Sequence, residues 1–413
     1  MNYVIIGNGT AAAGVIEGIR VVDKESPITL VSAENYPVYG RPLISYLLLG
    51  KTTEAKMLAY RPADFYEKNG VTALLGRTAE KIEGKIVLLD NGEHLPFDKL
   101  CFCTGSRPFV PPMEGLELVQ NKTSFMTLDD AKRLDAMLGE DKSKRVLIIG
   151  AGLIGLKCAE GIINRAKSIM VIDMAPRILP NVMLEKPGGI IQRHIEKQGV
   201  SFRLGDSVAK FTSANSATLQ SGEQVEFDIL VIAVGVRPNT GLAEGAGCTV
   251  NRGILLDNHM QTTVPDIYAA GDCTVSHDIS CDTDRILAIL PNAYMQGETA
   301  GMNMAGGDRT FDKAIPMNAS GFMGLHMITA GSYDGEQYLE ETENSYKLLV
   351  TRDDHLVGFI LLGDVERAGI YTSLIRERTP LSSIDFELIR EKPQLMAFSQ
   401  TERAKKLGGV RTW

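Results

Sequence analysis

The sequence has 413 residues, more than one hydrophobic core usually serves, so we expect two or three domains. Hydrophobic residues make up 44% of the sequence and charged residues 23%, as in an ordinary globular enzyme. The net charge of -8 argues against nucleic acid as a partner, because phosphate binding needs a basic surface. No apolar run is long enough to span a membrane, and no basic segment precedes the first expected strand as in a signal peptide. We therefore expect a cytoplasmic protein with no membrane segment.

The first predicted elements are a buried strand, a glycine-rich turn and a helix in residues 3–20, followed by a second strand at 27–32. Such a turn lets the backbone approach a pyrophosphate, and the helix N-terminus offers free N–H groups. A ribose-binding acid is expected about 20 residues later, but the strand ends at Ser32 and the nearest acid is Glu34. We predict dinucleotide contacts by Gly7, Gly9, Thr10, Ala11, Ala12, Ser32 and Glu34.

The same order of elements returns at residues 146–163, with a second strand at 168–173. The continuous apolar runs are typical of parallel strands covered on both faces, so the sequence predicts two doubly wound nucleotide-binding units. Asp173 ends the second strand, 18 residues after Gly155; its carboxylate would accept hydrogen bonds from both ribose hydroxyls and repel a 2′-phosphate. This pattern favours NADH over NADPH. The predicted contacts are Gly150, Gly152, Leu153, Ile154, Gly155 and Asp173.

From about residue 310 the pattern changes. The segments YKLLVTR and HLVGFILLG, joined by Asp353-Asp354, predict an antiparallel hairpin, and DVERAGIYTSLIRE predicts a helix. This part carries no nucleotide-binding signature.

Four further segments, in this order and spacing, resemble the pyridine nucleotide–disulfide oxidoreductase superfamily: TGSRP at 104–108, GVRPN at 235–239, DIYAAGDC at 266–273 and PNAYMQG at 291–297. The resemblance covers residues 3–300 and implies a bound FAD and an exchanging NADH. It implies that Thr104 and Gly105 lie in the turn that closes the first FAD-binding segment and that Gly235 lies in the matching turn that ends the NADH domain. It also implies that Asp272 hydrogen-bonds the ribityl chain and that Asn292 lies beside the flavin pyrimidine.

The implied fold is α/β, with two doubly wound Rossmann-like domains and a small α+β C-terminal domain. The NAD-binding domain, residues 111–239, would be inserted in an FAD-binding domain made of residues 1–110 and 240–312. Residues 313–413 would form the C-terminal domain. The sequence leaves open whether the protein is a monomer or a homodimer.

Residues 39–45, YGRPLIS, resemble a segment of one subgroup: NADH:rubredoxin reductases, small ferredoxin reductases and the FAD/NAD part of nitrite reductases. The C-terminal LLGDVERAGIYTSLIRE resembles the closing domain of the rubredoxin-reductase and nitrite-reductase branch. The resemblance implies that Arg41 approaches the pyrophosphate, that Pro42 lies near the flavin and that the backbone of Ala79 meets adenine. The alternative for Arg41-Pro42 is a simple turn with a surface arginine.

Cysteine placement decides the expected chemistry. Disulfide reductases and cysteine-using oxidases of this superfamily need a thiol beside the flavin, level with Pro42 to Ser45, but no cysteine precedes Cys101. Cys101 and Cys103 are two positions apart in an expected strand, and we interpret them as core residues on one face. The cysteine set of an iron–sulfur cluster is also missing, and no histidine spacing suggests a metal site.

We therefore expect hydride transfer from NADH to FAD and onward transfer to a small electron carrier such as rubredoxin. One alternative is a cysteine-independent NADH oxidase that reduces dioxygen. A non-enzymatic alternative is a redox-sensing or interaction module that binds FAD and NADH. The basic tail at 401–413 is either a docking site for an acidic carrier or a solvated helix end.

Lys157 departs from the family pattern. Many relatives have glutamate there, and in some ferredoxin reductases it pairs with a lysine at a position that is Tyr46 here. The resemblance implies that Lys157 approaches flavin N5 or the nicotinamide carboxamide and, with Pro42 and Tyr46, contributes to catalysis. The alternative is a helix lysine that extends to solvent.

Overall fold

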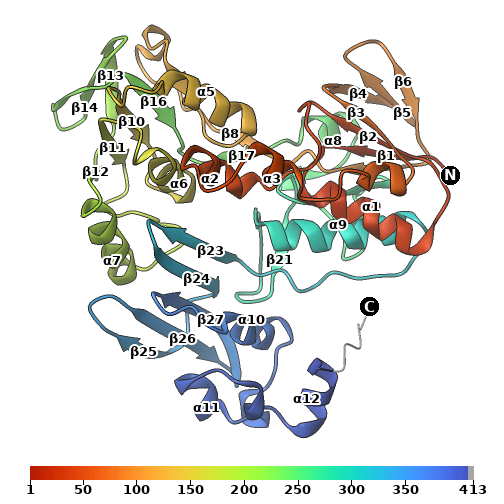
Figure 1. Cartoon of the computed structure of the whole chain (residues 1–413). Helices are drawn as coiled ribbons and strands as arrows, with labels where there is room; N and C mark the ends of the chain where they lie inside the picture. The colour runs from red at the N-terminus through yellow and green to blue at the C-terminus, as the bar shows by residue number, and fades with distance from the viewer. Residues whose placement is uncertain (408–413) are drawn as a thin grey trace. The chain divides into compact units, whose positions relative to one another are not determined.

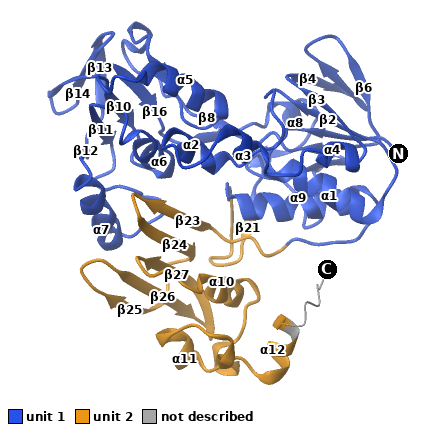
Figure 2. Ribbon diagram, viewed as in Figure 1, with its two compact units in different colours: residues 1–276, 286–311 blue, residues 277–285, 312–413 orange. Residues whose placement is uncertain are grey.

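The structure, a computed structural model, describes residues 1–407. Contacts within the chain divide it into two units (Figure 2). Unit 1 comprises residues 1–276 and 286–311, and unit 2 comprises residues 277–285 and the chain from 312 onward. The short segment 277–285 therefore belongs to unit 2, although unit 1 residues precede and follow it.

Unit 1 contains two five-stranded parallel sheets (Figure 1). The strands of the first sheet are, in spatial order, β20 (Ile267–Ala269), β7 (Lys99–Phe102), β1 (Tyr3–Ile6), β2 (Ile28–Ser32) and β3 (Val71–Leu75). Those of the second sheet are β12 (Val200–Leu204), β11 (Ser168–Asp173), β10 (Arg145–Ile149), β16 (Ile229–Ile232) and β9 (Lys122–Thr123). The chain returns to the first sheet with β20 only after the second is complete, so the second sheet is inserted in the first.

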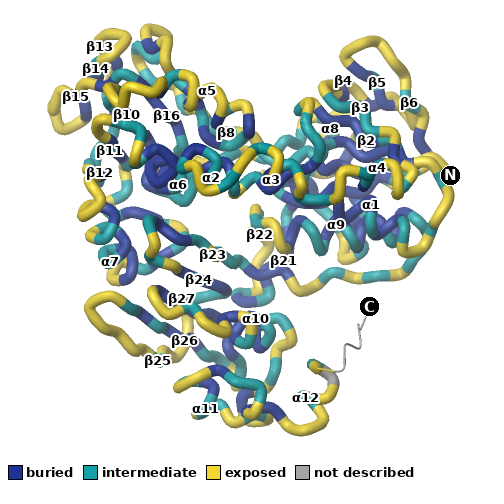
Figure 3. Tube along the Cα trace, in the orientation of Figure 1, coloured by how far each residue is buried: buried dark blue, intermediate teal, exposed yellow. Residues whose placement is uncertain are grey.

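The central strands of both sheets are buried, as their apolar sequences predict (Figure 3). Helix α1 (Thr10–Val22) follows β1, and it packs closely against α9 (Leu290–Met304) because both helices carry glycines at the contact. A Cβ atom at Gly297 would lie 2.1 Å from the Ala11 carbonyl oxygen. This contact holds α9, which follows the predicted flavin motif, on the first sheet.

Each parallel sheet is accompanied by a three-stranded antiparallel sheet, and a two-stranded ribbon links the two halves. The two antiparallel sheets are β4 (Ala79–Glu83), β5 (Ile86–Leu89), β6 (His94–Pro96) and β13 (Val208–Ser213), β14 (Ser216–Leu219), β15 (Gln224–Glu226). The ribbon is β8 (Ser106–Pro108) with β17 (Val236–Pro238). The remaining elements of unit 1 are η1 (Arg41–Leu43), α2 (Ile44–Leu48), α3 (Glu54–Leu58), α4 (Phe65–Lys68), η2 (Leu116–Leu118), α5 (Leu128–Leu138), α6 (Leu153–Ile162), α7 (Glu185–Glu196), α8 (Gly241–Gly245), β18 (Val250–Asn251) and β19 (Gly253–Ile254).

Unit 2 is built on a five-stranded antiparallel sheet. Its strands are β23 (Met317–Phe322), β24 (Leu325–Gly331), β27 (His355–Leu362), β26 (Tyr346–Arg352) and β25 (Glu336–Glu341), and its helices are α10 (Ala368–Arg376), η3 (Leu381–Ser383), α11 (Phe386–Glu391), η4 (Leu395–Ala397) and α12 (Gln400–Leu407). The predicted hairpin is β26–β27. Asp353 and Asp354 form its two-residue turn with φ of 49° and 62°, as a tight hairpin turn requires.

The segment 277–285 forms a hairpin with strands β21 (Ser276–Asp278) and β22 (Thr283–Arg285), and unit 2 holds it by several contacts. Ile279 packs against the core of unit 2, and the Arg352 guanidinium donates to the Ser280 carbonyl oxygen at 2.8 Å. Asp278 is fully buried, accepts from the Ser280 N–H and pairs with Arg285.

These observations confirm the predicted α/β fold with two Rossmann-like sheets, one inserted in the other, and a C-terminal part of mixed structure. The residue boundaries of the three expected domains stay predictions. Cys101 and Cys103 are buried in one core cluster, as expected. Within residues 1–407, no helix has the length and apolar character that crossing a membrane requires.

Candidate functional site

A cavity of about 420 Å³ opens at the carboxyl end of the first sheet, where the turn between β1 and α1 lies. Gly7 has a φ of +110°, and a Cβ atom there would lie 2.0 Å from the Cys103 carbonyl oxygen, so only glycine fits. Gly9 caps α1, and a Cβ atom on it would meet nothing within 4 Å. The turn therefore leaves open space in front of the free N–H groups of α1, as an anionic group requires.

Most of the residues predicted to contact FAD line this one cavity: Gly7, Gly9, Thr10, Ala11, Ser32, Glu34, Arg41, Ala79, Thr104, Gly105 and Asp272. Ala12, Pro42 and Asn292 are not among the lining residues. Ala12 is buried in the helix, Pro42 is exposed in η1, and Asn292 is buried in the first turn of α9.

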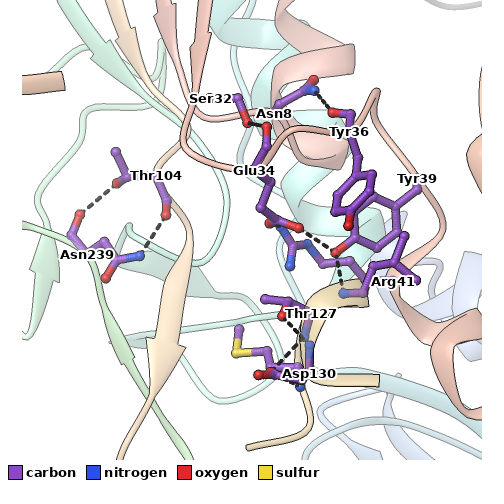
Figure 4. Close-up of polar contacts among 12 residues, drawn as sticks. Asn8, Ser32, Glu34, Tyr36, Tyr39, Arg41, Thr104, Thr127, Asp130 and Asn239 are labelled. Atoms are coloured by element: carbon purple, nitrogen blue, oxygen red, sulfur yellow. Dashed lines mark hydrogen bonds and ion pairs between the residues drawn. The ribbon is translucent and has the colours of Figure 1, made fainter. Parts of the chain in front are cut away.

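Glu34 is held by two side chains from the loop that follows β2 (Figure 4). Its carboxylate pairs with the Arg41 guanidinium and accepts a hydrogen bond of 2.7 Å from the Tyr39 hydroxyl. Tyr39 is 5% exposed, and burial raises the pKa of its hydroxyl above the ordinary value, so this group stays a donor at neutral pH. The segment predicted to hold ribose and pyrophosphate thus forms one hydrogen-bonded group.

Asp272 supplies an acceptor at the opposite side of the strand ends. Its carboxylate accepts from the Ser106 hydroxyl at 3.3 Å. Burial raises the pKa of Asp272, while the Ser106 hydrogen bond and the charge of Arg41 oppose that shift. The preceding Gly271 N–H donates to Gln296 of α9 at 2.9 Å, which fixes the segment before Asp272. Asp272 therefore has capacity for a hydroxyl donor, as the predicted ribityl contact requires.

The two linkers between the halves are joined beside the cavity by Thr104 and Asn239 (Figure 4). The Thr104 hydroxyl donates to the Asn239 carbonyl oxygen at 2.6 Å, and the Asn239 amide donates to the Thr104 carbonyl oxygen at 2.9 Å. Gly235, the residue predicted to end the NAD-binding part, has a φ of +114° and accepts from the Phe109 N–H.

The turn after β10 repeats the geometry of the first turn. Gly150 has a φ of +112°, Gly152 caps α6, and a Cβ atom on Gly152 would again meet nothing within 4 Å. A Cβ atom on Gly155 would lie 1.9 Å from the Gly150 carbonyl oxygen. Leu153 and Ile154, the other residues predicted here, form the first turn of α6.

Asp173 at the end of β11 accepts from the Ala151 N–H at 2.7 Å and from the Ala175 N–H at 2.8 Å. The carboxylate is thereby fixed beside the glycine turn, where the sequence predicts the ribose. The nearest basic residue along the chain, Arg177, donates to the carbonyl oxygens of Pro180 and Met183. Its guanidinium is occupied by the backbone.

Lys157 lies where α6 of the second half packs on α2 of the first. Its ammonium group is 4.5 Å from the centroid of the Tyr46 ring and pairs with Glu160, three residues further along the helix. The side chains of Lys157 and Glu160 are 17% and 5% exposed. The Lys157 ammonium group is therefore engaged within the protein rather than extended into solvent, and its role stays a prediction.

The two thiols at or beside this cavity, Cys103 and Cys273, are poor candidates for a reactive thiolate. Cys103 lines the cavity, but its sulfur contacts that of Cys101 at 3.8 Å, and this hydrogen bond together with burial raises the pKa of Cys103 well above its ordinary value. Burial likewise raises the pKa of Cys273 to about 12. Within residues 1–407, no group of three histidine, cysteine or acidic side chains has a metal-binding arrangement.

The structure adds cavity residues that the sequence motifs did not single out: Asn8, Arg77, Thr78, Met126, Thr127 and Leu290. The sequence could have indicated Asn8, because it stands between the two glycines of the turn. Nothing in the sequence pattern indicates Met126 or Thr127 as cavity residues. The tail predicted as a docking site or a solvated end begins as helix α12, where Lys406 bonds to Ser373 and Glu377. Arg411 and Trp413 lie outside the described residues.

Two family models match the chain. The model of the pyridine nucleotide-disulphide oxidoreductases matches residues 1–297, and that of the rubredoxin NAD+ reductase C-terminal domain matches residues 316–379. The chain is 31% identical to the NAD(P)H nitrite reductase of Bacillus subtilis (strain 168), over 92% of this chain and 48% of that protein. It thus spans about half of that relative's length.

Two other relatives are covered more fully. The chain is 30% identical to subunit epsilon of the NADH-dependent phenylglyoxylate dehydrogenase of Aromatoleum evansii, over 92% of this chain and 93% of that one. It is 30% identical to the rubredoxin-NAD(+) reductase of Pseudomonas putida, over 74% and 80%. Among solved structures, the covalent complex of putidaredoxin reductase with putidaredoxin matches with a TM-score of 0.86 at 24% identity, over 99% of both chains.

Proposed function

The chain is an NAD(P)H-dependent flavoprotein oxidoreductase of the pyridine nucleotide-disulphide oxidoreductase family, and we propose that it passes electrons from NADH through bound FAD to a small electron-carrier protein of the rubredoxin type. The coarse activity is shared by its relatives. The acceptor, the preference for NADH and the roles of single residues are the parts proposed.

The cavity of the first half fits FAD. The open space at Gly9 and the start of α1 suit the pyrophosphate, and the positive charge of Arg41 lies on the same wall. Glu34 and Asp272 supply acceptors for the ribose and ribityl hydroxyls. FAD held by these residues would supply the exchange between two-electron hydride chemistry and one-electron transfer. The protein's task is to orient the two cofactors and exclude water between them.

The observation that carries the proposed acceptor is the lack of a reactive thiol at this cavity. The segment at its edge, residues 41–48, has no cysteine, and the one cysteine of the lining, Cys103, has a raised pKa. We infer that electrons leave the flavin for an external acceptor rather than for a disulfide of the chain. The C-terminal match to the rubredoxin reductase domain supports a small carrier protein as that acceptor.

The geometry at Asp173 supports NADH as the donor. Two backbone N–H groups hold the carboxylate at the end of β11, so a 2′-phosphate would meet a fixed negative charge. Arg177 does not neutralise it, since its guanidinium is bound to backbone carbonyls.

We infer that Lys157, Tyr46 and Pro42 act where the two cofactors would meet. Lys157 stands on the helix that follows the NADH turn, and Tyr46 follows the Arg41-Pro42 segment of the FAD cavity. The stacking of the ammonium on the Tyr46 ring joins the two halves at this place. The positive charge would orient the nicotinamide carboxamide or attract electron density at flavin N5.

The test is anaerobic. The purified protein is reduced with NADH, its flavin absorbance is followed, and it is then mixed with oxidised rubredoxin or with air-saturated buffer. We expect rapid bleaching by NADH, fast reoxidation by rubredoxin and slow reoxidation by oxygen. Faster turnover with oxygen would identify an NADH oxidase instead, and tight NADH binding without turnover on any acceptor would identify a redox-sensing module.

Two matched variants separate the cofactor sites. Gly9→Ala and Gly152→Ala each add one methyl group to an open turn without a clash. We expect Gly9→Ala to purify without FAD. Gly152→Ala should keep FAD and raise the KM for NADH about tenfold, since the methyl group keeps the pyrophosphate from the helix N-terminus. If both variants lose FAD, or neither changes cofactor binding, the assignment of the two turns is wrong.

A further inference from the structure

Helix α5 of the second half begins beside the FAD cavity. Thr127 caps the helix, with its side chain accepting from the Asp130 N–H, and both Met126 and Thr127 line the cavity. The first N–H groups of a helix have no partner inside the helix, so each needs another acceptor. One of them, the Leu128 N–H, is buried and donates to a side chain from far along the chain.

That side chain is Tyr39. Its hydroxyl accepts from the Leu128 N–H at 3.0 Å, across 89 residues, and donates to Glu34 Oε2 at 2.7 Å. A hydroxyl has a single proton, so the direction of both hydrogen bonds is fixed: the helix N–H donates to Tyr39, and Tyr39 donates to the carboxylate. Hydrogen bonds in such a chain polarise each other, and each is stronger while the other is intact.

We propose that Tyr39 is a positioning residue that couples the occupancy of the FAD ribose site to the first turn of α5. The proposal rests on the proposed function, because it takes Glu34 as the carboxylate that faces the ribose. With the ribose hydroxyls on Glu34, the carboxylate is held in place, Tyr39 keeps its orientation, and the N-terminus of α5 is capped. Without the ribose, Glu34 keeps Arg41 and Tyr39 as partners but loses the ribose hydroxyls that would hold it further, and the cap on Leu128 is weaker.

The consequence is communication between the two cofactors. Helix α5 lies between β9 and β10 in the chain, both strands of the second sheet, so its first turn belongs to the half that would bind NADH. Coupling of this kind is reciprocal: a bound FAD that stabilises α5 is itself retained better when α5 is in place.

Tyr36 provides a matched control. It comes from the same loop and also contacts α5, but its hydroxyl donates to the side chain of Asp129 at 2.6 Å and accepts from the Lys132 ammonium group at 3.3 Å. It has no hydrogen bond to Glu34 or to a backbone N–H of α5 among the described contacts. Tyr36→Phe therefore removes a hydroxyl at the same helix without breaking the proposed chain.

The experiment compares the holoenzymes of wild type, Tyr39→Phe and Tyr36→Phe. Two quantities are measured: the rate of FAD dissociation, and amide hydrogen exchange of the segment around Leu128 with FAD bound and after its removal. In Tyr39→Phe we expect FAD to dissociate about tenfold faster, as for the loss of a hydrogen bond to a charged group. We also expect the protection that FAD gives to Leu128 in the wild type to disappear. Tyr36→Phe should behave as wild type in both measurements.

A purely structural role for Tyr39 would speed exchange at Leu128 equally with and without FAD and leave FAD dissociation unchanged; this result would overturn the proposal. If Tyr39→Phe does not fold, Glu34→Gln tests the same series of hydrogen bonds, because it keeps an acceptor for Tyr39 and removes the charge. FAD-dependent protection of the Leu128 amide should then shrink. Undiminished protection would refute the coupling. A wild-type protein that binds no FAD would instead refute the proposed function, and the two failures are thereby distinct.

Discussion

The two halves of unit 1 share the order of four parallel strands and a glycine turn, yet they hold the two acids proposed to bind ribose differently. Asp173 in the second half is held by two backbone N–H groups, that of Ala175 two residues along the chain and that of Ala151 in the glycine turn. Glu34 in the first half is held by the side chains of Tyr39 and Arg41.

The difference is the one expected between an exchanging and a retained cofactor. Backbone N–H groups present a carboxylate that is already in place, so a ligand can come and go without rearrangement of the site. Side chains from a loop that also contacts α5 tie the other carboxylate to a larger network, and a ligand bound there is released only when that network opens. On the proposed assignments, one fold supports two binding regimes through the partners of a single acid.

The largest expected effect on stability tests how closely the helix after each glycine turn approaches the backbone of that turn. Gly155→Ala would place a methyl group 1.9 Å from the Gly150 carbonyl oxygen, so we expect the free energy of unfolding to fall by about 3 kcal/mol and NADH binding to be lost. The matched exchange in the first half, Ala12→Gly, should cost only about 1 kcal/mol, from helix propensity. Urea unfolding of both variants checks the prediction; equal losses would mean that the two turns are packed alike.

The contact between α6 and α2 is tested by Lys157→Met, which keeps an unbranched side chain one atom shorter and removes its charge. Glu160 is 5% exposed and loses its ion pair, so we expect a loss of about 2 kcal/mol in the free energy of unfolding, reduced from the fully buried case by the partial exposure of Lys157. Flavin reduction by NADH should also be slower.

Lys51→Met is the control for this variant, because the Lys51 ammonium group lies 5.9 Å from the same Tyr46 ring but on an exposed residue. It should change neither quantity. A Lys157→Met protein with wild-type reduction rate and flavin midpoint potential would leave Lys157 a structural role only.

A smaller effect is expected at Asp173. Asp173→Asn keeps the shape of the side chain and removes the negative charge that opposes a 2′-phosphate. We expect the ratio of kcat/KM for NADH to that for NADPH to fall about tenfold, which corresponds to about 1.4 kcal/mol. Steady-state kinetics with both nucleotides measure this ratio. An unchanged ratio would mean that the second half selects its nucleotide by other contacts.

The smallest effect concerns Asp272, which has no counterpart in the second half. Burial raises the pKa of the Asp272 carboxyl in the folded, FAD-free protein. The protonated carboxyl therefore favours the folded state at pH values below the pKa of the unfolded chain. This contribution to stability is lost as the pH rises through the raised pKa of the folded state. Asp272→Asn should therefore make the FAD-free protein more stable at neutral pH, by less than about 1 kcal/mol, and equal to wild type below about pH 4. Thermal unfolding from acid to neutral pH measures this, and a variant less stable at neutral pH would contradict it.

The features that could be predicted from the sequence are those written in local patterns. The buried runs before Gly7 and Gly150 identify parallel strands, and the spacing from Gly155 to Asp173 places an acid at the end of the next strand, beside the glycine turn. The pairing of Lys157 with Glu160 was also within reach, because side chains three residues apart share one face of a helix. The family pattern by itself marks Lys157 only as an unusual residue.

Contacts between distant segments could not be predicted. The hydrogen bonds that join Thr104 to Asn239 span 135 residues, and nothing in either segment specifies the other. The same holds for the cap that Tyr39 provides to Leu128. Such pairs depend on how whole helices and sheets dock, and local residue patterns do not contain that information.

The hairpin at residues 277–285 sets limits on recombining this chain with others. It is a part of unit 2 encoded inside unit 1, so unit 2 is assembled from two stretches of the gene. A deletion after residue 311 would strip Ile279 of its packing partners and leave Asp278 exposed within a flavoprotein core fragment. In a chimera that exchanges only residues 316–379, the segment matched as a C-terminal domain, the incoming segment would have to pack against the hairpin 277–285 of the recipient chain. Exchange of this unit between relatives therefore requires two crossovers that move together, and a hybrid made with one is expected to fold poorly.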